Sequence, residues 1–248
     1  MRIKQCNMNS NFILILGFIM PIFGFSQMKT SIDAIGSLDY SYRSITTSSS
    51  DEFIKGLVER RNEGETGKVA WNAGLNLNRK LSKKIFLKTG VRFISTGYNG
   101  PVEEVTWGSQ HDGNGGQIED PSLPKEIQIK YNYWFIEIPL GIRWEINENK
   151  FAPFLEAGVA PSLYLRTRSA LVSDQDKEIS FSDDRVNKMN NIHAYGFISF
   201  GGNYTINEKY QLFAQPIFRY HLTKLADTPI REHLYSGGIE LGIRRKIQ

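Results

Sequence analysis

Cysteine is nearly absent from the 248-residue chain, which contains only Cys6. This residue lies in a basic leader and not at the end of an apolar run, a placement that argues against a lipoprotein anchor. The chain beyond the leader has no cysteine at all. Disulfides and thiolate metal sites are therefore excluded from its mature part.

Long apolar runs are also missing after the leader, so no membrane-spanning helix is predicted there. The leader itself has Arg2 and Lys4 before the apolar run FILILGFIMPIFGF, with Ser26 after it. About fourteen apolar residues are too few for a membrane span. The pattern predicts a secretory signal peptide at residues 1–26 and a mature domain at 27–248.

Charge of one sign does not dominate, since the chain has 30 Lys and Arg and 26 Asp and Glu. The pI near 9.0 could suggest a nucleic-acid partner. However, basic and acidic residues are interspersed, and an exported chain rarely meets nucleic acid. No nucleic-acid partner is predicted, and no cofactor is indicated.

Alternation of apolar with polar residues is what the sequence has in abundance. Between Tyr131 and Arg168, for example, Trp134 and Ile136 face one way while Glu137 faces the other. Such period-two alternation predicts β-strands. Eight runs show it: near 32–43, 68–80, 85–98, 131–146, 151–168, 192–206, 210–222 and 234–247.

The connections between these runs alternate in length. LSKK, NENK and NEK are tight turns, whereas the links near 44–67, 99–128, 167–190 and 224–233 are long and polar. This alternation predicts an all-β fold, an eight-stranded antiparallel up-and-down transmembrane β-barrel with short periplasmic turns and four long extracellular loops. An even number of strands closes the sheet, so that no backbone group is left unpaired in lipid. A soluble lipocalin-like barrel is the rival interpretation.

Aromatic residues on the apolar faces favour the membrane interpretation. They are expected in two girdles, one near the short turns and one near the long loops, as outer-membrane barrels have. The first girdle would hold Trp144, Phe151, Tyr204 and Tyr210, and the second Tyr40, Trp71, Trp134, Tyr220 and Tyr235. In this interpretation the apolar faces contact outer-membrane lipid.

The polar faces carry charges of both signs, and in a barrel of eight strands they point into an interior that side chains just fill. A lone buried charge is costly, but mutually paired charges are tolerable. We therefore predict an ion-paired plug, which disfavours a small-solute channel. Its members would be Asp33, Asp39, Lys88, Arg92, Glu137, Arg143, Glu145, Glu156, Arg166, Arg219, Glu240 and Arg244.

Four prolines lie inside the predicted strands, where each removes a backbone donor. They are Pro139, Pro153, Pro161 and Pro216. Since a closed barrel has no free edge, we expect each to occupy a bulge or a strand end.

The motifs FIEIPLGIRW, FLEAGVAPSLYL, QPIFRYHLTKL and SGGIELGIRRK resemble the Bacteroidota outer-membrane β-barrel family that includes PorT-like proteins. The resemblance covers residues 28–248. It implies an eight-stranded outer-membrane barrel, and the association of PorT with type IX secretion makes secretion proteins possible partners. No catalytic motif is carried over. The resulting hypothesis is a non-enzymatic accessory in secretion, assembly or surface interaction.

An outer-membrane barrel enzyme, a hydrolase or acyltransferase acting at the outer mouth, is the alternative. His193, His221 and His233 fall near the long loops, and Asp39, Asp183, Asp184 and Asp227 could approach them. Such a group could perform acid–base chemistry or bind a metal. Ser199 and Ser236 share the lumenal face, but neither stands out as a nucleophile. Polar side chains lining a wet rim are the simpler interpretation, and the favoured one.

Two loop segments are expected to be irregular. HDGNGGQIED offers oxygen ligands from Asp112, Asn114, Glu119 and Asp120, but Gln117 stands where a calcium-binding EF-hand loop needs glycine. A surface loop is therefore favoured over a calcium site. TTSSSDE is expected to be a disordered loop.

Overall fold

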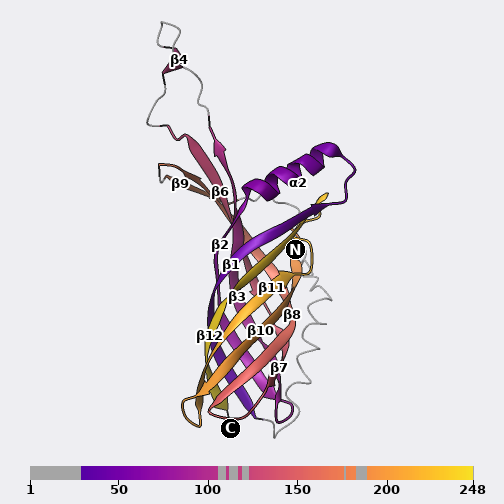
Figure 1. The fold of residues 1–248 in the computed structure, drawn as a ribbon, viewed down its shortest axis with the longest axis vertical. Coiled ribbons are helices and arrows are strands. Elements are labelled where there is room, and N and C mark those ends of the chain that lie inside the picture. Colours follow the sequence, from indigo (N-terminus) through magenta and orange to yellow (C-terminus); the bar gives the residue numbers. More distant parts are fainter. Residues whose placement is uncertain are drawn as a thin grey trace, which may run out of the picture.

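The computed structural model describes residues 29–105, 110–111, 117–118, 123–175, 177–182 and 189–247. The predicted signal peptide, Asp112, Asn114, Glu119, Asp120, Asp183 and Asp184 lie outside these residues. Within them, eight long strands form a barrel that is drawn upright in Figure 1. The short turns lie at its lower end and the long connections at its upper end.

The predicted fold class is confirmed. The barrel strands are β1 (Thr30–Thr47), β2 (Thr66–Lys80), β3 (Ile85–Glu104), β6 (Glu126–Glu137) continued by β7 (Leu140–Glu145), β8 (Phe151–Ser173), β10 (Ile192–Thr205), β11 (Tyr210–His221) and β12 (Ile230–Ile247). All neighbours pair antiparallel, and β1 pairs with both β2 and β12. The sheet is therefore closed and has no edge in the barrel wall.

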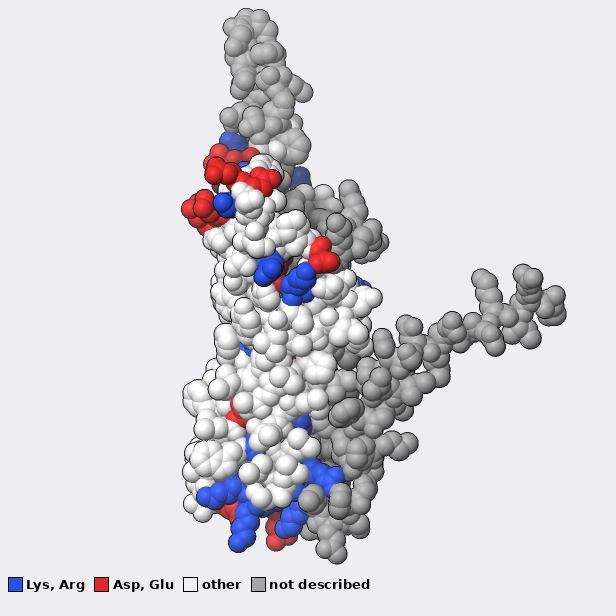
Figure 2. All heavy atoms as spheres, turned by 90° about the vertical axis from the view of Figure 1, so that its right-hand side faces the viewer, with Lys and Arg blue, Asp and Glu red and all other residues white. Residues whose placement is uncertain are grey.

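Burial alternates along each strand with the apolar residues outside. In β11, Leu212 and Phe218 are exposed, whereas Gln215 and Arg219 are buried. Figure 2 shows the resulting surface, an uncharged belt with charged side chains gathered towards both ends. A soluble barrel has the opposite arrangement, so the alternation places lipid against the outside of this one.

The prolines interrupt the strand pairing locally. Pro139 lies in the break between β6 and β7, and across it the Ile138 N–H donates to the Pro161 carbonyl at 2.9 Å. Pro161 has no N–H with which to return that bond. At Pro216 the β10–β11 pairing lapses and then resumes in the same register. Pro153 lies near the start of β8, where its carbonyl accepts from Ile146 beside the turn.

Several elements rise above the barrel. Strands β3, β6 and β8 continue past the outer girdle, and β9 (Glu178–Ser182) pairs with β8 there. The short strands β4 (Gln110–His111) and β5 (Gln117–Ile118) pair with each other. In Figure 1 these elements stand over one side of the barrel and the helix α2 (Glu52–Gly64) over another. This outer part was not predicted.

The segment TTSSSDE is ordered, contrary to our expectation. Its first residues end β1, and Asp51 caps α2 by accepting a hydrogen bond from the Phe53 N–H at 2.9 Å. Asp is a favourable N-cap because its carboxylate satisfies a free N–H of the first turn. No helix among the described residues has the length and apolarity that crossing a membrane requires.

Candidate functional site in the lumen and at the outer mouth

Charged side chains fill the middle of the barrel. The structure places eleven of the twelve predicted charges inside it, all of them buried. We call this set the lumenal network: Asp33, Asp39, Lys88, Arg92, Glu137, Arg143, Glu145, Glu156, Arg219, Glu240 and Arg244. They come from six of the eight barrel strands because the inward positions repeat every second residue.

Two pairs in the network join residues directly opposite on adjacent strands. Arg244 on β12 holds Asp33 on β1 with two hydrogen bonds, of 2.8 and 3.1 Å. Arg143 on β7 contacts Glu156 on β8 at 2.7 and 2.8 Å. The Arg244–Asp33 contact joins two nitrogens to two oxygens, which is the stronger geometry for such pairs, whereas both Arg143 contacts reach one oxygen of Glu156.

Other pairs cross the lumen or join nearby strands. Glu240 on β12 contacts Arg92 across the lumen on β3 at 3.2 Å, and it contacts Arg219 on the adjacent strand β11 at 2.9 Å. Arg219 reaches Asp39 on β1 at 2.7 Å. Arg244 contacts Glu145 at 3.3 Å, and their strands stand diametrically opposite in the ring. These contacts leave the lumen occupied through its middle.

Glu137 is the exception in the network. The set has five cations and six carboxylates, and Glu137 forms no ion pair with any described residue. Its Oε1 also has no hydrogen-bond partner there, although the residue is only 1% exposed. Arg92 lies directly opposite it on β3, but Arg92 contacts Glu240 instead.

The prediction for Arg166 is wrong, because this residue lies outside the barrel. The β6–β8 register shifts between Trp134 and Phe135, which leaves Leu165 as an extra residue in β8. A bulge of this kind reverses the facing of every residue beyond it. The Arg166 guanidinium is therefore exposed and lies over the Trp134 ring at 4.1 Å.

Aromatic side chains close the lumen above the charges. Tyr98, Tyr133 and Phe135 are buried together with Leu225 and Leu234. Leu225 belongs to the connection between β11 and β12, yet it is only 1% exposed. Backbone bonds with Asn190 and Glu232 fix its position. A loop residue therefore covers the upper end of the lumen.

The predicted rim histidines are partly brought together. His193 and His221 are buried with ring centroids 4.7 Å apart, and Tyr195 stacks on His221 at 4.4 Å. His233 instead contacts the His221 carbonyl at 2.9 Å and stacks on Tyr220.

The acidic partners of a catalytic group are not found near these rings in the part of the chain that the structure describes. Asp39 contacts Arg219, Asp227 contacts Lys224, and Ser199 bonds to Gln215 at 3.1 Å. Ser236 is buried opposite Arg219 on the neighbouring strand. Within the described ranges, no three His, Cys, Asp or Glu side chains converge as metal ligands.

A second ionic group, which we call the mouth cluster, ties α2 to the barrel. Arg43 on β1 contacts Glu65 at the end of α2, Glu232 on β12 at 2.6 Å, and the Tyr98 hydroxyl at 2.5 Å. Arg61 on α2 contacts Glu65 at 3.0 Å and Glu232 at 2.9 Å. Burial lowers the pKa of Arg61, but these carboxylates outweigh it and hold the pKa above its ordinary value.

The mouth cluster was not predicted. Arg43 ends a predicted run on its polar face, which is a weak signal that it points inward. Glu65 and Glu232 fall in or beside long connections, and their positions depend on folds that period-two alternation does not describe. Only the structure brings the four side chains together.

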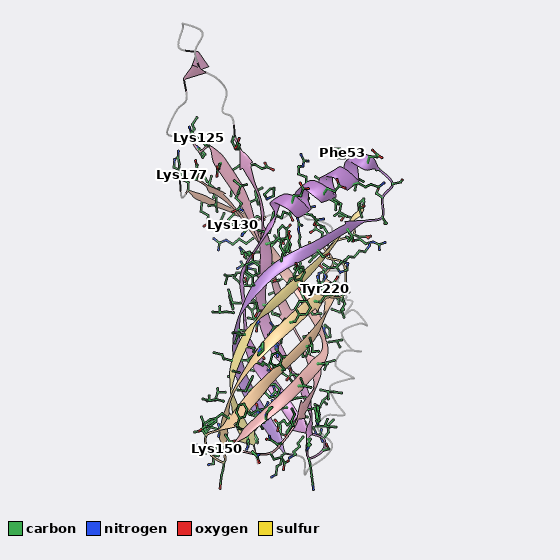
Figure 3. The ribbon with its side chains drawn as sticks, viewed as in Figure 1. Phe53, Lys125, Lys130, Lys150, Lys177 and Tyr220 are labelled. Carbon is green, nitrogen blue, oxygen red and sulfur yellow. The ribbon has the colours of Figure 1, made fainter. Side chains whose placement is uncertain are left out.

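The lower end of the barrel opens into a vestibule of about 940 Å³. Arg244 and Glu145 form its inner boundary, and Lys80, Lys150 and Lys246 stand around it. Figure 3 labels Lys150 at this end. The vestibule therefore ends at the lumenal network.

The aromatic residues of both predicted girdles face outward. Trp144, Phe151, Tyr204 and Tyr210 are exposed near the short turns, as are Tyr40, Trp71 and Tyr220 near the other end. Trp134 and Tyr235 are half-buried there because neighbouring rings cover them. The two rows mark the boundaries of the apolar belt.

Comparison with known proteins gives a family match. The model of the outer membrane protein beta-barrel domain matches residues 19–227. A comparison with curated proteins finds no match. Among solved structures, the chain is similar to Neisserial surface protein A, with 11% identity, 88% of this chain and 97% of that chain covered, and a TM-score of 0.45. It is also similar to the outer membrane protease OmpT from Escherichia coli, with 10% identity, 90% and 99% covered, and a TM-score of 0.44.

Proposed function

Because the chain belongs to the outer membrane protein beta-barrel domain family, we propose that it is a non-enzymatic outer-membrane protein that presents a contact surface for other proteins outside the cell. The observation that carries this proposal is the outer part of the molecule. There α2 is held by the mouth cluster, and β3, β6, β8 and β9 form a sheet beyond the membrane.

This outer part exposes apolar side chains above the upper aromatic girdle. Phe53 on α2 is 76% exposed and Ile179 on β9 is 63% exposed. Strand β9 pairs only with β8 among the described strands, so the backbone N–H and C=O groups on its second edge pair with no described strand. An open strand edge beside exposed apolar residues suits pairing with a strand of another protein. The resemblance to PorT-like proteins makes secretion and assembly components the first partners to test.

Transport through the barrel is disfavoured by the same structure. Leu225 and its aromatic neighbours cover the upper lumen, and the lumenal network fills the middle. In planar bilayers the protein should therefore give no stable conductance steps. Large, steady steps would contradict a closed lumen and favour a channel.

Photocrosslinking in native outer membranes tests the contact surface. A photoreactive residue placed at Phe53 or at Ile179 should yield discrete crosslinked products that mass spectrometry can identify. Leu81, which is 46% exposed in a short turn at the opposite end, is the matched control position. Identified secretion components would support the PorT-like role. Products at neither outer position, or the same products at Leu81, would overturn the proposal.

A further inference from the structure

Four cationic side chains lie near one another on the outer wall of the barrel, at the upper girdle and just above it. They are Lys68 on β2, Lys130 on β6, and Arg166 and Arg168 on β8. We call them the outer-wall patch. In the strand register Arg166 is opposite Trp134, Arg168 is opposite Asn132, and Lys130 lies two residues further along β6. Figure 3 labels Lys130 where β6 leaves the barrel.

A glycine between the strands connects the two halves of the patch. Gly97 on β3 is paired with Asn132, and its lack of a side chain leaves the surface between β2 and β6 open. Across this gap the Lys68 ammonium donates to the Asn132 Oδ1 at 2.6 Å. A Cβ at Gly97 would lie 2.0 Å from the Tyr131 carbonyl oxygen, so only glycine fits here.

The patch groups four positive charges on one part of the described surface. Among the described residues, none of the four cations forms an ion pair. Burial, and then the nearby charge of Lys130, lower the pKa of Lys68, whereas Glu178 acts in the opposite direction. Glu178 is the acidic residue that faces this side from β9, and it accepts a hydrogen bond from Ser180, to which Arg168 donates.

The position of the patch along the barrel axis indicates which part of the membrane it contacts. Directly below it, the Trp71, Phe93 and Trp134 rings form a continuous aromatic strip with centroids 5.6 and 5.1 Å apart. Such rings mark the boundary between acyl chains and headgroups. Arg166, which is level with Trp134, and the side chains one or two rows beyond it therefore stand at the headgroups of the outer leaflet.

We propose that the outer-wall patch binds the phosphorylated headgroup of a glycolipid in the outer leaflet. The arginines offer paired N–H donors to phosphate oxygens, and the two lysines add compact positive charges. The aromatic strip packs against the upper part of the lipid's acyl chains. Although Arg168 bonds to Ser180 on β9, this lipid site uses the four cations and not Phe53 or Ile179, so it can be tested separately from the contact surface proposed above.

Lipid binding can be measured with the full chain in phosphatidylcholine nanodiscs that contain diphosphorylated lipid A. Replacing Lys68, Lys130, Arg166 and Arg168 together with Gln should weaken retention of lipid A at least about tenfold, since each cation near an anionic surface contributes separately. Lipid A without phosphates should bind the unmodified protein as weakly as diphosphorylated lipid A binds the Gln variant. The variant Arg166→Lys/Arg168→Lys, which keeps the charge but not the paired donors, should lose less affinity than the Gln variant and more than the control below.

The control variant is Lys83→Gln/Lys84→Gln/Lys150→Gln/Lys209→Gln, which removes four cations from the short-turn end. It should bind lipid A as the unmodified protein does. An equal loss in this control would overturn the proposal, because binding would then reflect overall charge. Equal retention of phosphorylated and phosphate-free lipid A would also overturn it, as would full competition by phosphatidylglycerol.

Discussion

The lumenal network and the mouth cluster are built from the same chemistry but hold different things together. Both join arginines to carboxylates with contacts near 2.6–3.3 Å. The lumenal network links barrel strands to each other in a buried interior. The mouth cluster links one helix to the barrel, and its Arg61 and Glu232 side chains stay 24% and 19% exposed. The comparison indicates that the first group supports the whole barrel and the second only the position of α2.

Removing one carboxylate from the lumenal network should have the largest effect. Glu240 contacts Arg92 and Arg219 and accepts from Gln215 at 2.6 Å. Glu240→Gln would leave both guanidinium groups buried without this charge, and breaking a buried ion pair costs about 3–5 kcal/mol. We expect the free energy of unfolding in lipid vesicles to fall by that amount in a denaturant titration. A loss below about 1 kcal/mol would show that the network does not support the barrel.

Breaking the mouth cluster should have a smaller and local effect. Arg43→Gln removes contacts to Glu65, Glu232 and the Tyr98 hydroxyl, and hydrogen bonds to charged groups contribute roughly 1.5–3 kcal/mol. Amide exchange in α2 should accelerate correspondingly, while exchange in the barrel strands stays unchanged. Arg231→Gln, at an exposed neighbour of Glu232, is the control. Loss of the entire barrel with Arg43→Gln would erase the difference between the two groups.

The cap of α2 should contribute less again. Asp51→Ala removes the acceptor for the Phe53 N–H, which costs about 1 kcal/mol for a typical N-cap. Exchange should increase in the first turn of α2 and hardly change at Arg61, where the mouth cluster holds the other end. Asp51→Ser keeps an acceptor and should restore protection. Uniform acceleration along α2 would indicate that the cap and the mouth cluster act as one unit.

The barrel could be predicted from the sequence because one face of every strand had to be apolar. That constraint repeats at every second residue, and it also located the lumenal charges. It failed at Arg166, where the single extra residue Leu165 reverses the facing. An insertion of one residue leaves no mark in composition, and the apolar–polar pattern around it still looks regular.

The outer part could not be predicted in the same way. The α2 helix is short and polar, and only Val58 in it is buried, so no periodic apolar face indicated it. The run of serines before Asp51 suggested a loop, although the same residues are typical of a helix start. Leu225 and Glu232 depend on how a connection folds back over the mouth. Residues that act through tertiary contacts of this kind are visible only in the structure.

The smallest effect should come from the one carboxylate of the lumenal network that has no ion pair. Glu137 is as buried as Glu240. However, removing its charge leaves no cation without an ion pair, because Arg92 and Arg219 both contact Glu240. Glu137→Gln should therefore leave the free energy of unfolding unchanged to within about 1 kcal/mol, or raise it, since an isolated buried charge is itself unfavourable. The two Glu→Gln variants differ only in position, so denaturant titrations under the same conditions compare them directly. A loss at Glu137 equal to that at Glu240 would mean that the carboxylates act through the total negative charge of the lumen and not through their individual partners.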